Sequence, residues 1–282
     1  MKLVFDKVQQ RAEQKAAPAA PEFTFELTPH DSEFKYVITI VGEKNSGKTS
    51  TAYGFPGKKL FLSFDNRSVQ PLRYMGGFVD KDSIDVVNMQ KYMVAVNFDI
   101  DDDELLRQWQ LSCVTTYKYT NYVLSEAEKR GYDWIVFDCA EVLSGICEQV
   151  MRYRNNLAPA QGIRARSLWK ERNILMNMLH QRALLSAKQG LIYTTYNQIV
   201  NVSVKDGEVV EATRQPAWYG SMKLETLVTL YTDAVFDAKT GEKRFFVRID
   251  SKIPEFPDGV LLDITNKTIM QAIAELGADG AE

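Results

Sequence analysis

Short hydrophobic runs rich in β-branched and aromatic residues alternate with helical stretches along most of the chain. The runs predicted as strands are 35–41, 59–64, 84–88, 133–138 and 190–196. Strands that are separated by helical segments favour a mostly parallel sheet with helices on both faces. The pattern therefore predicts an α/β fold.

Two long helices are predicted from apolar side chains that recur at helical spacing. The first spans 103–130, and its apolar positions are Leu106, Trp109, Cys113 and Tyr117. The second spans about 167–188, and the apolar positions on one side of it are Leu175, Met178, Leu179 and Leu185. We expect both stripes to pack in the core, because residues at this spacing share one face of a helix.

The pattern changes after residue 220, where two β-runs, 226–237 and 243–250, are separated by turn residues at 239–241. We therefore expect antiparallel strands near the C-terminal end.

The length of 282 residues and the hydrophobic content of 45% are enough for one main domain. Residues 9–22 are rich in Ala, Gln and Pro and are typical of a linker. The predicted organisation is an N-terminal segment and linker at 1–22, a domain at 23–270 and a C-terminal tail at 271–282.

The charges nearly balance, with 34 basic and 37 acidic residues, so any nucleic-acid contact must come from local basic clusters. The cysteines, Cys113, Cys139 and Cys147, lie in apolar segments, and the only histidines are His30 and His180. A zinc site is therefore not expected. No apolar run approaches the length of a membrane span. We expect a cytoplasmic protein with reduced thiols and no membrane partner.

One segment matches the pattern G-x-x-x-x-G-K-[ST] of a phosphate-binding loop, between an apolar strand and a helical stretch. Its residues are Gly42, Glu43, Lys44, Asn45, Ser46, Gly47, Lys48 and Thr49, and Ser50 follows them. The glycines allow backbone conformations that turn successive N–H groups toward a phosphate. Lys48 would reach the β- and γ-phosphates, and Thr49 would hold Mg²⁺.

A loop of this kind also needs a carboxylate on a neighbouring strand to orient the metal ion. The apolar run Trp134–Phe137 ends in Asp138, which is the candidate for this role. An aspartate in an ordinary turn after a strand is the alternative.

The order of these parts resembles RecA-type recombinases, and especially the smaller phage-encoded RecA-like ATPases, over roughly residues 35–265. The resemblance implies a RecA-like P-loop fold with ATP and Mg²⁺ as cofactors. In that family the strand after the loop helix ends in a carboxylate that activates the attacking water. Here that residue is Asp65, where the family usually has Glu, and Glu141 is a rival for the role.

The resemblance also assigns other residues of the nucleotide site. Tyr74 would stack on adenine, and Gln198 would sense the γ-phosphate and couple it to the following loop. Lys252 matches a lysine that reaches the nucleotide of a neighbouring subunit, whereas Asp250 stands where another lysine is usual. A homo-oligomer, either a filament or a ring, is therefore implied. A packing tyrosine, a turn glutamine and a surface lysine are the alternatives.

In recombinases, the stretches after Asp138 and after Gln198 both touch single-stranded DNA. Here these stretches contain the candidates Arg152, Arg154, Arg164, Arg166, Arg214 and Trp218. Arginines would follow the phosphates, and the tryptophan would stack on a base. A solvated basic surface that pairs with acids such as Glu171 is the alternative.

The predicted function is that of a RecA-like ATPase that couples its nucleotide state to single-stranded DNA binding in recombination, annealing or replication. One alternative is a P-loop motor or switch that acts on protein partners or in genome packaging. Another is a module that binds nucleotide without hydrolysing it.

Overall fold

The structure is a computed structural model that describes residues 34–65, 67–75, 77–93, 102–205, 208–220, 222–238 and 240–279. Within these ranges, the side chains of 102, 199–205, 208–214, 278 and 279 are not described. The chain divides into residues 1–33 and 34–282, and the described residues belong to the second unit. The domain start expected at residue 23 therefore lies outside the described residues.

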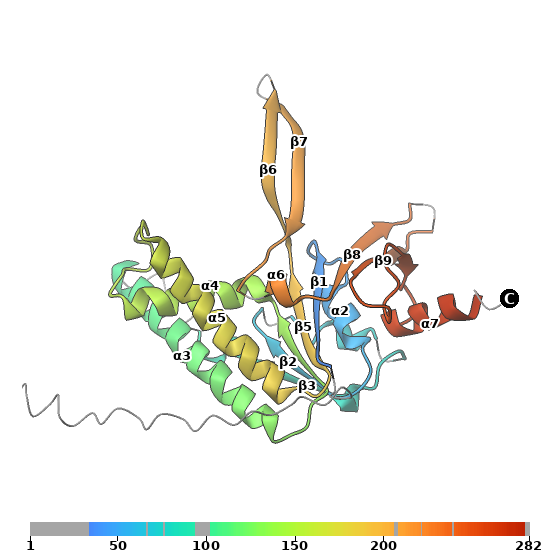
Figure 1. Cartoon of the computed structure of the whole chain (residues 1–282), viewed down its shortest axis with the longest axis horizontal. Coiled ribbons are helices and arrows are strands. Elements are labelled where there is room, and N and C mark those ends of the chain that lie inside the picture. The colour runs from blue at the N-terminus through green and yellow to red at the C-terminus, as the bar shows by residue number, and fades with distance from the viewer. Residues whose placement is uncertain are drawn as a thin grey trace, which may run out of the picture. The chain divides into compact units, whose positions relative to one another are not determined.

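The predicted sheet is present at the centre of this unit (Figure 1). Its strands are β1 (Tyr36–Gly42), β2 (Lys59–Ser63), β3 (Ile84–Asn88), β4 (Trp134–Asp138), β5 (Gly190–Thr195), β8 (Val228–Phe236), β9 (Lys243–Ser251) and β10 (Leu261–Asp263). Their order across the sheet is β10-β9-β8-β1-β5-β4-β2-β3. The pairs from β8 to β3 are parallel, and β9 and β10 pair in antiparallel fashion. The mostly parallel sheet with antiparallel strands near the C-terminal end is thus confirmed.

Helices cover both faces of the sheet. One face carries α3 (Asp102–Glu128), α4 (Ala140–Arg154) and α5 (Arg166–Ser186), and the other carries α2 (Lys48–Tyr53) and α7 (Ile269–Asp279) (Figure 1). Leu60 and Leu62 of β2 pack on the α3–α5 side, whereas Phe61 packs on the α2 side. Because the parallel strands are buried on both faces, their sequences are apolar throughout.

Short helices lie in the connections. They are η1 (Pro71–Arg73), η2 (Lys81–Ser83), η3 (Met89–Tyr92) and α6 (Met222–Glu225). No helix in the described part of the chain is long and apolar enough to cross a membrane.

The two long helices are confirmed, but their predicted stripes are correct only in part. In α3, Cys113 and Tyr117 are buried, whereas Leu106 is 37% exposed. The stripe predicted for α5 is half correct. Leu175 and Leu179 are buried, whereas Met178 is 54% exposed and Leu185 is 75% exposed. The buried face of α5 continues from Leu175 and Leu179 to Ala183, at steps of four residues, which turns Met178 and Leu185 toward solvent.

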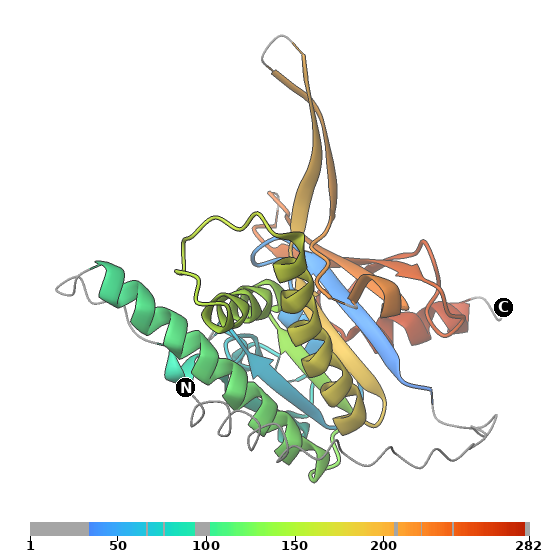
Figure 2. The same ribbon diagram turned by 60° about the vertical axis from the view of Figure 1, so that its left-hand side comes forward.

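Two further elements differ from the sequence-based expectation. β6 (Asn197–Lys205) and β7 (Glu208–Pro216) form a separate antiparallel hairpin, which projects away from the central sheet (Figures 1 and 2). In addition, most of the expected C-terminal tail belongs to α7, whose Ile269 and Ala272 are buried against the sheet.

Candidate nucleotide-binding site

The phosphate-binding loop connects the carboxyl end of β1 to the start of α2, as predicted. A side chain at Gly42 would collide with Thr232 and Ser46, whose hydroxyls are hydrogen-bonded to each other at 2.7 Å. Gly47 has φ 94° and Asn45 has φ 65°, so the loop enters left-handed backbone conformations that glycine adopts without strain. The loop is therefore wound tightly and tied to β8 through Thr232.

Lys48 is folded onto this loop. Its Nζ donates to the carbonyl oxygens of Gly42 at 2.8 Å and Glu43 at 2.9 Å, and lies 3.9 Å from the centre of the Tyr196 ring. Burial lowers the pKa of Lys48, and the negative charge of Glu141 is the largest opposing influence. Lys48 thus places a buried cation at the carboxyl edge of the sheet.

Asp138 ends β4 and meets Thr49 directly. The Thr49 hydroxyl donates to the two Asp138 carboxylate oxygens at 3.1 and 3.3 Å. Ser68 donates to the same carboxylate at 2.6 Å, and Thr194 donates to its other oxygen. Burial raises the pKa of Asp138, and the hydroxyls of Ser68 and Thr194 oppose this shift.

The Thr49 hydroxyl and the Asp138 carboxylate fit a magnesium ion, because Mg²⁺ prefers oxygen ligands and keeps several waters. No group of three or more Asp, Glu, His or Cys residues that could hold a metal occurs in the described parts of the chain. Nucleotide phosphates and water would therefore complete the coordination, as is usual for Mg²⁺ beside a phosphate-binding loop.

Asp65 follows β2 at the same edge of the sheet. β2 pairs with β4 so that Ser63 lies opposite Asp138, and Asp65 comes two residues later. Its carboxylate accepts a hydrogen bond from the backbone N–H of Arg67 at 2.9 Å and lines the cavity beside the loop. The negative charge of Asp65 contributes to the raised pKa of Asp138, which places the two acids near each other.

Glu141, the rival of Asp65, lies in the first turn of α4 and is not among the residues that line the cavity. Both of its carboxylate oxygens are buried. Burial raises the pKa of Glu141, and the Cys139 thiol and the Lys48 ammonium oppose the shift. Glu141 is therefore near Lys48 but does not line the cavity.

The cavity beside the loop has a volume of about 470 Å³. Two groups of lining residues differ in chemistry. The polar group, called the phosphate end, is Lys48, Thr49, Asp65, Asp138 and Thr194. The apolar group, called the base end, is Tyr74, Met75, Phe78 and Ile264. A polyphosphate matches the first group and a planar base matches the second. Lys44, Asn45, Gly47 and Ser50 also line the cavity, as the sequence predicts for the loop.

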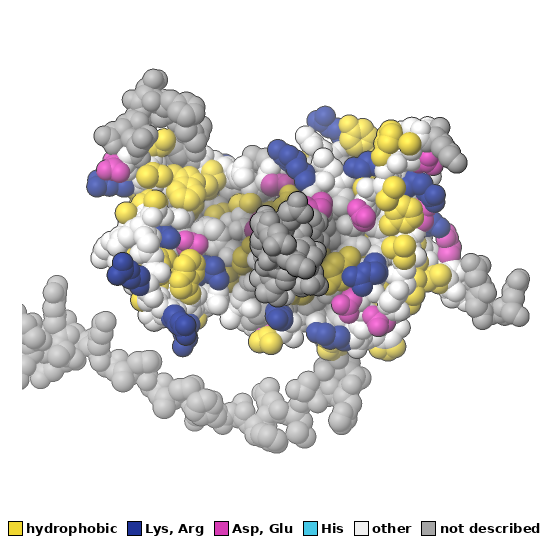
Figure 3. All heavy atoms as spheres, turned by 90° about the horizontal axis from the view of Figure 1, so that it is seen from above, with side chains coloured by type: hydrophobic (Ala, Val, Ile, Leu, Met, Phe, Trp, Pro, Cys, Tyr) yellow, Lys and Arg dark blue, Asp and Glu magenta, His cyan; other side chains and the backbone are white. Residues whose placement is uncertain are grey.

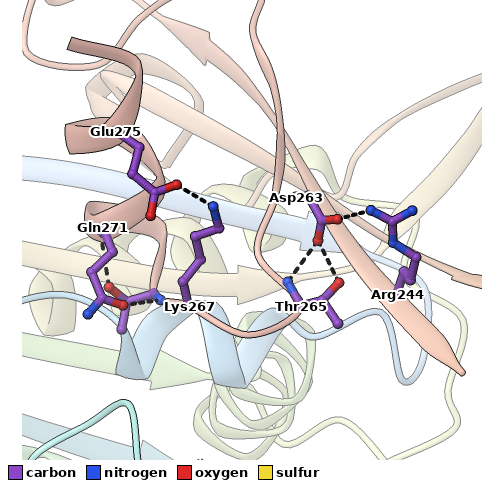
Figure 4. A network of polar contacts seen from close by, with 7 residues as sticks. Arg244, Asp263, Thr265, Lys267, Gln271 and Glu275 are labelled. Carbon is purple, nitrogen blue, oxygen red and sulfur yellow. Dashed lines mark hydrogen bonds and ion pairs between the residues drawn. The ribbon is translucent and has the colours of Figure 1, made fainter. Parts of the chain in front are cut away.

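The residues near the C-terminal end that line this cavity were not predicted from the sequence. The loop between β10 and α7 is fixed by the polar network in Figure 4. Asp263 accepts hydrogen bonds from the Thr265 N–H at 2.9 Å and hydroxyl at 2.5 Å, and pairs with Arg244. Thr268 and Gln271 exchange hydrogen bonds at the start of α7, as in a capping box. The Thr-x-x-Gln spacing was the available sequence signal.

The predicted sensor lies apart from the cavity. Gln198 is exposed, is the second residue of β6 and does not line the cavity. Tyr196, two residues earlier, lines the cavity and contacts Lys48. The link between the phosphate end and the β6–β7 hairpin therefore passes through Tyr196.

Lys252 lies at the opposite end of the sheet from the loop of its own chain. Val228 at the start of β8 pairs with Ile38 and with Ser251 of β9, because β9 runs antiparallel to β8. Lys252 directly follows Ser251, and its Nζ donates to the Thr226 carbonyl at 2.9 Å. A contact with a nucleotide would have to involve another chain.

The predicted DNA-contact residues differ in exposure. Arg152 is only 8% exposed, pairs with Glu148 at 2.8 Å and donates to the carbonyls of Ala158 and Gln161. It holds the connection after α4 and is not available to a DNA phosphate, so this assignment is corrected. Arg154 is exposed with a long ion pair to Glu171 at 3.9 Å.

Arg164 and Arg166 are exposed, and Trp218 is half-buried against the core. The side chain of Arg214 lies outside the described residues. A side chain at Gly220 would meet Asn177 and Met176, so the segment after β7 lies beside α5. In Figure 3, Lys and Arg side chains on the hairpin end of the molecule are scattered among acidic and hydrophobic ones.

The strand order, the phosphate-binding loop and the Thr49–Asp138 contact define a P-loop NTPase with a RecA-like α/β fold. The chain belongs to the AAA domain family, whose model matches residues 35–247. It is also similar to the crystal structure of a KaiC-like protein from the hyperthermophilic archaeon Pyrococcus horikoshii OT3. That match has 13% identity and a TM-score of 0.37, and covers 81% of this chain and 84% of the other. No curated protein sequence matches the chain significantly.

Proposed function

We propose that this protein binds ATP with Mg²⁺ and hydrolyses it in the cavity beside residues 42–49. The contact between Thr49 and Asp138 carries the proposal, since the Oγ1 and Oδ2 atoms are 3.1 Å apart. The two residues are 89 positions apart in the sequence, yet they meet at the cavity that Lys48 also lines. A hydroxyl, a carboxylate and a lysine around one cavity are the groups that phosphoryl transfer requires.

Lys48 would exchange its bonds to the loop carbonyls for oxygens of the β- and γ-phosphates and would stabilise the charge that develops there. Thr49 and Asp138 would hold Mg²⁺, which neutralises the phosphate oxygens when bound. Asp65 would orient and deprotonate the attacking water, because its carboxylate lines the cavity close to Asp138. Glu141 is the weaker candidate for that role, because its buried carboxylate does not line the cavity.

The base end would hold adenine. Tyr74 is exposed at the cavity rim and presents a ring on which a base can stack. Lys252 would act only on the nucleotide of a neighbouring chain, so its proposed role requires a homo-oligomer. Gln198 would respond to the γ-phosphate through Tyr196, which connects Lys48 to the start of the hairpin.

We further propose that nucleotide state controls the binding of single-stranded DNA. Arg154, Arg164 and Arg166 are exposed cations near the connection between α4 and α5, and Trp218 follows the hairpin. Positive side chains beside an aromatic ring suit a single strand, since charges follow phosphates and rings stack on bases.

The test is a steady-state ATPase assay with and without a single-stranded oligonucleotide, with Lys48→Ala as the control. We expect Mg²⁺-dependent hydrolysis that rises when the oligonucleotide is added. If the oligonucleotide does not bind and does not change the hydrolysis rate, the result would favour a motor or switch with protein partners. ATP binding without single-turnover hydrolysis would identify a nucleotide-binding module.

A further inference from the structure

The first residues of β9 lie against the phosphate-binding loop. Lys243 and Phe245 are two residues apart on a strand, so they share one face of it. Lys243 Nζ donates to the carbonyl oxygen of Asn45 at 2.7 Å. A side chain added at Gly47 would come within 3.1 Å of the Phe245 ring. β9 therefore contacts the loop at two of its eight residues, in a way the motif itself does not reveal.

Lys243 and Lys48 form similar hydrogen bonds, although Lys48 is buried and Lys243 is exposed. Both line the cavity, and both ammonium groups are hydrogen-bonded to carbonyl oxygens of the loop. In the part of the chain that the structure describes, no ion pair holds Lys243. An anionic phosphate oxygen attracts an ammonium more strongly than a neutral carbonyl oxygen does, because both partners are then charged. A polyphosphate in the cavity would therefore compete with Asn45 for Lys243.

We propose that Lys243 is a second nucleotide-binding cation, which exchanges the Asn45 carbonyl for an oxygen of the bound polyphosphate. The inference rests on the proposed function, because it takes ATP as the ligand of this cavity. Lys243 supplies its charge from the same chain as the loop. By contrast, Lys252 donates to its own Thr226 carbonyl at the far end of the sheet. The contribution of Lys243 to ATP binding therefore requires no neighbouring chain.

The experiment compares Lys243→Met with wild type by thermal unfolding and by calorimetric titration with a non-hydrolysable ATP analogue and Mg²⁺. Methionine keeps the length of the side chain and removes its charge. We expect an unchanged unfolding midpoint without nucleotide, a smaller midpoint shift with the analogue and a Kd about tenfold weaker. Lys243→Arg should keep most of the affinity, because it retains a donor and the charge.

The matched control is Arg248→Met, which removes an equal charge from the other face of β9. The Arg248 guanidinium lies 4.4 Å from the centre of the Tyr231 ring and does not line the cavity. We expect this variant to bind the analogue like wild type. An equal loss of affinity in both variants would overturn the proposal, because it would identify a general charge effect.

A different failure would identify Lys243 as a structural support of the loop. In that case Lys243→Met would lower the unfolding midpoint without nucleotide and keep the wild-type Kd, which contradicts the proposal. If wild type itself binds no ATP analogue, the proposed ATP site fails, and the inference fails with it. If wild type binds and Lys243→Met binds equally well, only the inference about Lys243 is wrong.

Discussion

The two ends of the cavity hold their side chains in different ways. At the phosphate end, Lys48 and Asp138 are buried, and hydrogen bonds from or to fixed neighbours hold both. At the base end, Tyr74 is 85% exposed, and apolar groups such as Met75 and Ile264 form the wall. Preorganised polar groups act on developing charge, whereas exposed rings add contact area. Substitution of Lys48 or Asp138 should therefore affect turnover, and substitution of Tyr74 should affect affinity.

The largest effect is expected for Lys48→Ala. This change removes the buried cation that would neutralise the transferred phosphoryl group, and turnover should fall by about 10²–10³-fold or more. The fold should survive, because alanine is a good helix former at the first residue of α2. Steady-state ATPase assays measure the loss, and circular dichroism checks the fold. Near-wild-type turnover would contradict the role of the phosphate end in the proposed mechanism.

The next largest effect is expected for Asp65→Asn, with Glu141→Gln as its comparison. Asp65 lies near Asp138 and Glu141 lies near Lys48, but only Asp65 lines the cavity. Asp65→Asn should retain ATP binding and lose about 10²-fold or more in single-turnover hydrolysis, since it removes a general base. Glu141→Gln should change the single-turnover rate by less than about threefold. The reverse ranking would transfer the base role to Glu141.

A smaller effect is expected at the base end. Tyr74→Ala should raise KM by about two- to tenfold, which corresponds to the loss of one stacked ring, with kcat nearly unchanged. Tyr74→Phe is the matched control and should resemble wild type, because it keeps the ring. Initial rates over a range of ATP concentrations separate the two parameters. A large fall in kcat with unchanged KM would show that the two ends are not separate in function.

The smallest expected effect concerns stability and the buried carboxylate of Glu141. Burial raises its pKa above the ordinary value of 4.5, so the folded state favours the protonated form. The cost of ionising it appears as pH rises above 4.5 and is complete above the folded-state pKa. Glu141→Gln should therefore raise the unfolding midpoint at pH 8, and raise it less at pH 4.5. A constant difference across this range, measured by scanning calorimetry, would contradict the ionisation argument.

The phosphate end could be predicted from sequence because its parts are local. Residues 42–49 are contiguous, and Asp138 ends an apolar run that is recognisable by itself. Asp65 was assigned from the resemblance to RecA-type recombinases, in which the strand after the loop helix ends in a carboxylate. Neither assignment required knowledge of how distant strands pair.

The rest of the site depends on pairing that the local pattern does not contain. Lys243 meets Asn45 across 198 positions, because β9 turns back antiparallel and begins beside the loop. The same reversal carries Lys252 to the far end of the sheet. Arg152 was predicted to contact DNA, but its guanidinium donates hydrogen bonds to backbone carbonyls in the connection after α4. Burial of a single arginine is set by tertiary packing rather than by its own composition or spacing.

The most direct test of the proposed ATP site is single-turnover hydrolysis of ATP by wild type and Asp138→Asn at several Mg²⁺ concentrations. The amide keeps the shape of the side chain but is a poorer partner for Mg²⁺ and its waters. We expect Mg²⁺-dependent hydrolysis by wild type. In the variant, the hydrolysis rate should fall by about 10²-fold or more, with ATP binding largely retained. Equal, Mg²⁺-dependent rates in the two proteins would contradict the assignment of Asp138 and of the site built around it.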